Sequence, residues 1–206
     1  MNLVAKTLSL LAVAAVSASL AKADAIPYGN TGQVAPEVAT FATSNGGVNV
    51  YFYGSTAANS DTVRVYDVQT GYNSGDILPN HTTAQGTEVT VGTGPGQINA
   101  GDQLVFFING PAGLFASAAS YSSDNVNHGY VTNYTGGVAG IPAGLFVGLE
   151  DLPSSSSDFN YNDDTFVFTG VSAPSISATP EPGSLALLGT GTLSLLGVAR
   201  RRFLAA

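Results

Sequence analysis

The sequence contains no cysteine, no tryptophan and few basic residues. The absence of cysteine excludes disulfide bonds, zinc–thiolate sites and thiol-based catalysis. The absence of tryptophan removes the usual aromatic platform for sugar rings. Lysine and arginine together number six, and five of them lie near the two ends of the chain, at Lys6, Lys22, Arg200, Arg201 and Arg202.

The central part of the chain is strongly acidic. Residues 24–179 hold 13 Asp and Glu residues against a single arginine, Arg64, which is a net charge of −12 before the two histidines are counted. Such a charge repels phosphate backbones and anionic lipid headgroups, so we expect no nucleic-acid partner. Cations and neutral sugars suit it better, and a bound cation would offset the self-repulsion of the domain.

The first 23 residues have the pattern of a secretory signal peptide. Lys6 is followed by an apolar run over residues 8–20, and Ala21 and Ala23 fit the small residues of a cleavage site for signal peptidase. A second possible cut follows Ala25, so the mature N-terminus is expected at Asp24 or Ile26. The alternative is a buried helix of the domain, but the run has the length of a signal sequence and proline-containing polar sequence follows it.

Residues 24–171 have the pattern of one all-β domain, long enough to bury a core. Short alternating segments rich in β-branched and aromatic residues recur between Gly, Asn, Asp and Pro clusters, and no helical repeat is sustained. About eight strands predict an antiparallel β-sandwich, jelly-roll or immunoglobulin-like, whose strand order the sequence leaves open. The candidate strands are residues 47–53, 62–68, 87–91, 103–108, 114–121, 129–134, 145–149 and 165–171.

The C-terminal part has three pieces after a polar linker at residues 172–179. Residues 180–182 read Pro-Glu-Pro, residues 183–199 are uncharged and largely apolar, and three arginines follow at 200–202. A helix over 183–199 would span roughly 25 Å, slightly less than a typical hydrocarbon core. We therefore expect a short transmembrane helix with the arginines on the cytoplasmic side and the β domain outside.

This tail, residues 180–206, resembles the PEP-CTERM sorting signal in its triplet, its short Gly- and Leu-rich helix and its basic end. The resemblance implies a substrate of an exosortase, held briefly in the inner membrane and then released to the cell surface or to extracellular polymer. Pro180, Glu181 and Pro182 would be recognition residues, with Arg200, Arg201 and Arg202 completing the signal. The alternative is a permanent membrane anchor.

An acidic loop lies between two candidate strands, within residues 148–168. Calcium takes six to eight oxygen ligands, and Asp or Asn at alternate positions, as at 158, 160 and 162, can direct several oxygens inward. The loop is no EF-hand, because Asp163 stands where that motif needs Gly and Thr169 where it needs Glu. The alternative is a set of solvated turn residues. The predicted calcium ligands are Glu150, Asp151, Asp158, Asn160, Asn162 and Asp163.

The same loop resembles the signature of the domain of unknown function 4114 family. Residues 148–152, Gly-Leu-Glu-Asp-Leu, and residues 158–163, Asp-Phe-Asn-Tyr-Asn-Asp, match it, with Leu149 in place of Phe, a serine run in place of glycines and Asn160 in place of Asp. Weaker similarity extends over residues 46–171. The resemblance implies an extracellular β-rich module with adhesive or matrix roles and no established chemistry.

The sequence contains few features that indicate an enzyme. Glu150 with Asp158 or Asp163 could supply the two carboxyls of a glycan hydrolase, and no hydrolase, zinc-protease or phosphate-loop motif is present. His128 and His81 are each isolated and are expected to be structural. We therefore predict a non-catalytic, exported structural or binding module with extracellular polysaccharide as a possible partner, and a carboxylate-dependent glycan hydrolase as the alternative.

Overall fold

The computed structural model describes residues 32–174. The predicted signal peptide at 1–23, with Ala21 and Ala23, and the predicted sorting tail at 180–206, with its apolar helix, lie outside the described residues. Within residues 32–174 no helix is both long and apolar enough to cross a membrane. The strands are β1 (Thr40–Ala42), β2 (Val48–Ser55), β3 (Thr62–Asp67), β4 (Glu88–Val91), β5 (Gln103–Gly110), β6 (Gly113–Ala116), β7 (Gly129–Tyr134), β8 (Gly144–Leu149), β9 (Asp164–Thr169) and β10 (Val171–Ser172).

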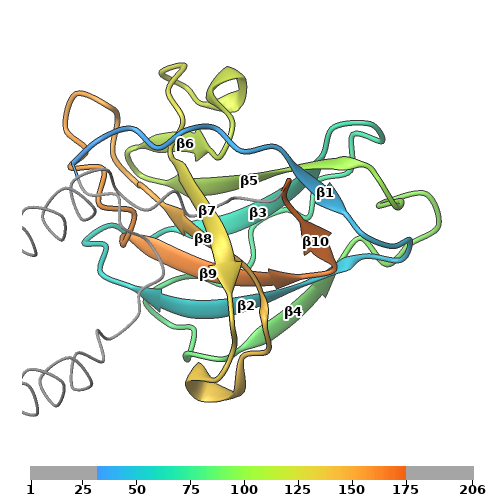
Figure 1. Ribbon diagram of the computed structural model, residues 1–206. Coiled ribbons are helices and arrows are strands. Elements are labelled where there is room, and N and C mark those ends of the chain that lie inside the picture. The colour runs from blue at the N-terminus through green and yellow to red at the C-terminus, as the bar shows by residue number, and fades with distance from the viewer. Residues whose placement is uncertain (1–31, 175–206) are drawn as a thin grey trace, which may run out of the picture. The chain divides into compact units, whose positions relative to one another are not determined.

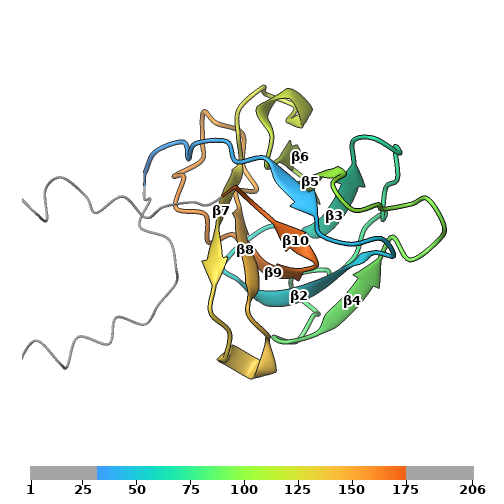
Figure 2. The same cartoon turned by 45° about the vertical axis from the view of Figure 1, so that its right-hand side comes forward.

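Two antiparallel sheets contain these strands. The first sheet has the order β10-β1-β5-β3. β1 and β6 lie along the same edge of β5, where β1 pairs with residues 103–104 and β6 with residues 107–110. The second sheet has the order β4-β2-β9-β8-β7. Figure 1 shows the strands, and in Figure 2 β1, β5 and β3 form one layer above β9, β2 and β4. The prediction of an all-β antiparallel fold is confirmed, and the arrangement is consistent with a β-sandwich.

Aromatic side chains fill the space between the sheets. Phe106 of β5 stacks on Phe168 of β9 with ring centroids 4.0 Å apart, so the contact joins the first sheet to the second. Phe52 of β2 meets Phe166 edge to face at 5.7 Å. The inward residues of β2 alternate with outward ones, which is the pattern of a strand with one core face. Residues 164–168 of β9 are all buried, because Val167, on the face opposite Phe166 and Phe168, packs in a small outer cluster with Tyr134, Ile141 and Phe146.

β5 departs from this alternation because both of its faces are covered. Residues 104–108 are all buried. Val105 and Phe107 face away from the other sheet and pack beneath Ala118 and Tyr66. This second small core explains the unbroken apolar run in the sequence of β5.

One predicted strand, residues 114–121, is too long. β6 ends at Ala116, and residues 119–121 form a 3-10 turn instead. Side-chain bonds replace the strand ladder at this point: the Ser117 hydroxyl accepts from Phe106 N of β5 at 3.0 Å, and the Ser122 hydroxyl accepts from Ala116 N at 2.9 Å. β1 and β10 were not predicted, and their pairing through Phe41 and Ser172 extends the first sheet one residue into the predicted linker.

Candidate functional site

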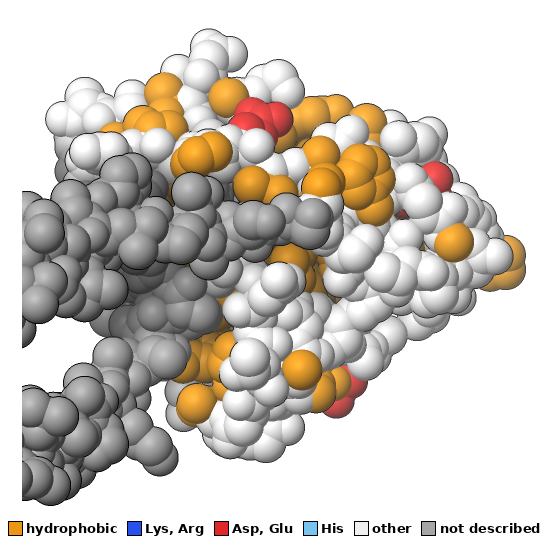
Figure 3. All heavy atoms as spheres, in the orientation of Figure 1, with side chains coloured by type: hydrophobic (Ala, Val, Ile, Leu, Met, Phe, Trp, Pro, Cys, Tyr) orange, Lys and Arg blue, Asp and Glu red, His pale blue; other side chains and the backbone are white. Residues whose placement is uncertain are grey.

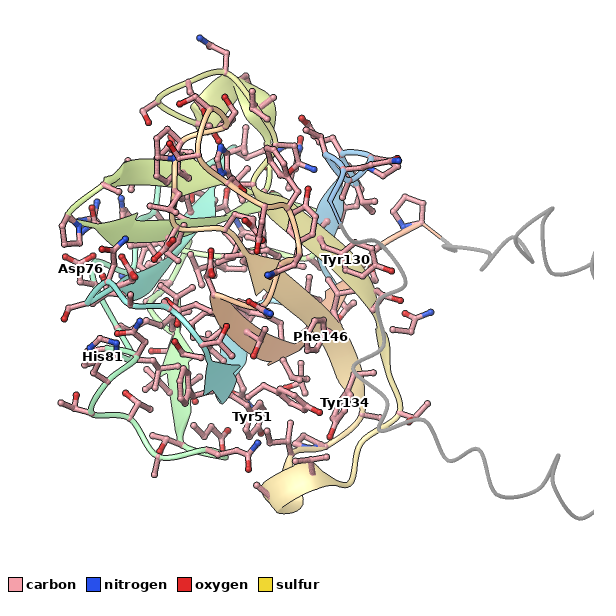
Figure 4. All side chains as sticks on the ribbon, turned by 90° about the vertical axis from the view of Figure 1, so that its left-hand side faces the viewer. Tyr51, Asp76, His81, Tyr130, Tyr134 and Phe146 are labelled. Atoms are coloured by element: carbon pink, nitrogen blue, oxygen red, sulfur yellow. The ribbon has the colours of Figure 1, made fainter. Side chains whose placement is uncertain are left out.

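Two loops meet at one end of the domain, the loop between β2 and β3 (residues 56–61) and the long loop between β8 and β9 (residues 150–163). Both lie at the left of Figure 1, and Figure 4 views the domain from that side. Their backbones are bonded directly, since Thr56 N donates to Asp163 O at 3.0 Å. Asn59 Nδ2 donates to Asp151 Oδ2 at 2.9 Å, so side chains join the loops as well.

The strand register brings the two ends of the long loop together. Leu149, the last residue of β8, pairs with Asp164, the first residue of β9. Glu150 and Asp163 therefore leave the sheet side by side, and Asp151 N donates to Asp163 Oδ2 at 3.1 Å. Adjacent antiparallel strands thus place carboxyls from both loop ends in one region.

Glu150 holds the loop in shape through hydrogen bonds to its interior. The side chain is buried, with 1% exposed, and its carboxylate accepts from Ser157 Oγ, from Phe159 N at 3.2 Å and from Tyr161 N. Burial raises the pKa of Glu150, while these donors lower it. Phe159 and Tyr161 have positive φ angles of 50° and 58°, a left-handed backbone that the bonds to Glu150 help to fix.

The alternating residues of the loop make local turns. Asp158 is exposed, and its carboxylate accepts Asn160 N at 3.2 Å and Asn160 Nδ2 at 2.7 Å. Asn160 Oδ1 accepts Asn162 N at 2.9 Å, and Asn162 Oδ1 accepts from the Thr56 hydroxyl at 2.6 Å. These are side-chain-to-backbone turns of the kind Asn and Asp commonly form.

A buried carboxyl cluster lies behind the loop, between the ends of the two sheets. Its members are Asp61, just before β3, Asp151, just after β8, and the consecutive pair Asp163 and Asp164 at the start of β9. Asp61, Asp151 and Asp164 have exposed fractions of 1%, 5% and 0%. No donor within residues 32–174 hydrogen-bonds to either carboxylate oxygen of Asp61 or of Asp164.

The ionisation of this cluster is strongly perturbed. Burial raises the pKa of Asp61 to about 7, and the neighbouring Asp151 carboxylate adds to the effect. Burial also raises the pKa of Asp163 to about 7, assisted by the charges of Glu150 and Asp151. Burial raises the pKa of Asp164 to about 7. The nearby side chains of Ser55 and Asn80 lower this pKa, but their effect is smaller than that of burial. The common cause is desolvation of carboxyls that lie beside one another.

The predicted calcium ligands are thus distributed over different environments. Glu150 is engaged by three loop donors, Asp158 and Asn160 form surface turns, and Asn162 bonds to Thr56. Only Asp151 and Asp163 join the cluster, and the structure adds Asp61 and Asp164, which the sequence analysis missed. No three His, Asp or Glu side chains in the described part of the chain are arranged, as they stand, to hold a metal ion.

Asp164 carried a signal in the sequence that was not used. Asp164, Phe166 and Phe168 stand at every second position of β9 and therefore point to the same face of the sheet. Recognising β9 as a strand is thus enough to place Asp164 on the core side. Asp61 carried no comparable signal, because it lies in a turn-like stretch and its partners Asp151 and Asp164 are far along the chain.

Both histidines make hydrogen bonds within the fold. His128 is fully buried, stacks on Phe115 with centroids 4.4 Å apart, and approaches both carboxylate oxygens of Asp124 at 3.1 Å through Nε2. Asp124 also accepts Ser154 N at 2.8 Å and so supports the long loop. His81, in the connection between β3 and β4, has its ring between Ser60 Oγ and Ala57 O of the loop between β2 and β3.

A separate pocket of about 230 Å³ lies on the outer face of the second sheet. Tyr53 forms its aromatic side and packs against the fully buried Phe146, with ring centroids 5.4 Å apart. Tyr53 also contacts Tyr134 at 5.6 Å. Figure 4 labels Phe146 and Tyr134 together with Tyr51 on this part of the molecule. The other lining residues are Gly54, Ser55, Thr56, Gln85, Asn162 and Thr165.

Comparison with known proteins identifies the tail. Residues 178–202 match the model of the PEP-CTERM protein-sorting motif. The match includes the Pro-Glu-Pro triplet and the three arginines, so the prediction of this sorting signal is confirmed. The resemblance of residues 46–171 to the domain of unknown function 4114 family is not shown by this comparison. No curated protein and no solved structure matches the chain.

Proposed function

We propose that this chain is an exported, exosortase-sorted protein whose β domain is a non-catalytic structural or binding module of the cell surface or extracellular polymer. The sorting motif at residues 178–202 carries the first half of the proposal, because such a motif implies passage through the membrane and processing by an exosortase. Signal peptidase would act first at the N-terminus, after Ala23 or Ala25. The inner membrane would hold the protein only transiently.

The export step is tested in the host cell with and without its exosortase. With the enzyme present, we expect the β domain at the cell surface or in the medium. Without it, we expect the unprocessed chain to accumulate in the membrane fraction. Identical distribution in both cells would refute sorting by an exosortase. A matched variant, Glu181→Ala, tests whether the triplet is the recognised element.

The proposal that the domain is non-catalytic is supported by the hydrogen bonds of Glu150, one of the two carboxyls that the hydrolase alternative requires. A glycan hydrolase needs two carboxyls that reach the substrate. The Glu150 carboxylate instead accepts three hydrogen bonds from its own loop and has 1% of its surface exposed. Purified protein is therefore expected to release no sugar from the host's extracellular polysaccharide. Turnover that Asp163→Asn abolishes in a folded protein would establish the hydrolase instead.

The binding role is supported by the pocket on the outer face of the second sheet. The ring of Tyr53 beside the amide groups of Gln85 and Asn162 is suited to a neutral sugar, which offers an apolar face and hydroxyls. Among the residues that Figure 3 colours, most of the surface is uncharged, with scattered hydrophobic side chains, small separate acidic patches and no Lys or Arg on the face drawn. A neutral polymer meets no repulsion on such a surface, whereas a polyanion would.

Binding is measured by affinity electrophoresis through gels that contain the host's neutral extracellular polysaccharide. We expect the native protein to be retarded and Gln85→Ala, at the pocket, to be retarded less. Gln103→Ala is the matched control, because this glutamine lies in the first sheet, away from the pocket. Equal migration of all three proteins in gels with and without polymer would refute this binding site.

A further inference from the structure

The carboxyl cluster has no lysine or arginine beside it to neutralise its negative charge. Of the 12 Asp and Glu residues in the described chain, five are buried: Asp61, Asp67, Glu150, Asp151 and Asp164. Arg64 is the only Lys or Arg among residues 32–174, and it is paired with Asp76 at 2.5 Å. The cluster therefore has no lysine or arginine from the described chain as a counterion, and the basic side chain that acts on it is His81, which opposes the rise in the pKa of Asp61.

Two members of the cluster also lack hydrogen-bond donors. Asp61 and Asp164 are at most 1% exposed, and no donor among the described residues meets hydrogen-bond geometry with either carboxylate. The side chains of Ser55 and Asn80 lie close enough to Asp164 to lower its pKa, but they do not offset its burial. Asp61 Oδ1 packs on the backbone of Gly110, where an added Cβ would lie only 1.5 Å from it. Buried carboxyls in native proteins normally accept hydrogen bonds, pair with a cation or coordinate a metal ion. These oxygens are therefore available to coordinate a cation.

The chemistry of the donors selects the ligand. All four side chains offer hard carboxylate oxygens. Asn59 donates to Asp151, Asn80 Oδ1 accepts from Asp61 N, and the Ser55 hydroxyl lies beside Asp164. Both ring nitrogens of His81 already have hydrogen-bond partners, Ser60 Oγ and Ala57 O, so His81 adds no nitrogen ligand. An all-oxygen set of irregular shape suits calcium, which takes six to eight oxygens, better than magnesium, which demands a regular octahedron.

We propose that Asp61, Asp151, Asp163 and Asp164 bind one calcium ion between the ends of the two sheets. The side chains do not form a finished coordination shell as they stand, so binding draws them inward. The ion then ties β3 of the first sheet to β8 and β9 of the second. This site differs from the loop site predicted from sequence, because Glu150, Asp158, Asn160 and Asn162 are not ligands. The inference rests on the proposed function only in placing the domain outside the cell, where calcium sites of weak affinity are occupied.

The test uses the full-length chain, purified in detergent and freed of metal with EDTA. Calorimetric titration with calcium chloride is expected to give a single site with a dissociation constant of roughly 10⁻⁵ to 10⁻³ M. Calcium at a hundredfold excess over that constant should raise the melting temperature by several degrees, and magnesium should raise it less. No heat of binding, or equal melting in calcium, magnesium and EDTA, would overturn the proposal.

Two variants separate a ligand from a residue needed only for folding. Asp61→Asn removes a buried, unpartnered charge, so in EDTA it is expected to melt at or above the temperature of the native protein. In calcium it should lose the rise and bind at least tenfold more weakly. Asp158→Asn, in the surface turn, is the matched control and should bind as the native protein does. Weaker binding by Asp158→Asn with unchanged binding by Asp61→Asn would place the ion in the loop and refute this site. Export and processing are measured separately in cells, so their failure is distinguishable from failure of the calcium site.

Discussion

Replacing Glu150 with alanine should destabilise the domain severely, because three donors lose their acceptor at once. Tyr161 is fully buried, and its N–H has no water to replace the lost carboxylate. A bond to a charged acceptor contributes about 1.5–3 kcal/mol, and a buried unsatisfied donor costs about 1–3 kcal/mol. Relief of repulsion with Asp158 and Asp163 offsets part of this loss. We expect a net cost of about 3 kcal/mol, which for a domain of this size lowers the melting temperature by roughly 10 °C.

The measurement is thermal unfolding of the purified protein in EDTA, followed by circular dichroism. Glu150→Gln retains one acceptor oxygen and should lose about 1–2 kcal/mol, less than alanine does. Asp158→Asn lies in the same loop but is exposed, and it should change stability by less than about 0.5 kcal/mol. If Glu150→Ala melted within about 2 °C of the native protein, the hydrogen-bonding role argued for Glu150 would be refuted.

Asp124 and Gly148 supply two further predictions. Burial would raise the pKa of Asp124, but bonds from Ser154, His128 and Val126 outweigh it and hold the value at about 2. Because this lies below the unfolded value of 3.8, native protein should exceed Asp124→Ala in stability by about 1–2 kcal/mol above pH 5, and the gap should close between pH 4 and 2 in acid-unfolding curves. A gap independent of pH would contradict this ionic role. Gly148→Ala should lower the free energy of unfolding in urea by about 1–3 kcal/mol, because its Cβ would lie 2.3 Å from Tyr161 O. Unchanged stability would show that the backbone at Tyr161 moves aside without cost.

The sequence was sufficient for those strands whose side chains alternate or form dense apolar runs. β2 was predicted because its inward residues repeat at every second position, and β9 because it is a short run of aromatic and β-branched residues, buried on both faces. β1 and β10 were not, because strands of three and two residues carry no periodicity. The end of β6 was misplaced because side-chain bonds to the hydroxyls of Ser117 and Ser122, rather than residue propensity, end the strand.

The candidate site could be predicted only where its residues are neighbours in the sequence. The density of acidic residues at 150–163 led to Asp151 and Asp163, and the strand register confirms that the two loop ends meet. Asp61 enters from another sheet and about 90 residues away, so no local pattern contains it. Glu150 was predicted as a metal ligand on composition alone, whereas its hydrogen bonds depend on loop geometry that composition does not encode.

Intact-mass spectrometry of the surface or secreted protein, purified from its host, tests the central claim most directly. An exported and exosortase-processed chain should begin at Asp24 or Ile26 and should end near Pro182, without Arg200, Arg201 and Arg202. Mass that includes the three arginines in all exported protein would contradict processing and would leave a permanent membrane anchor in its place.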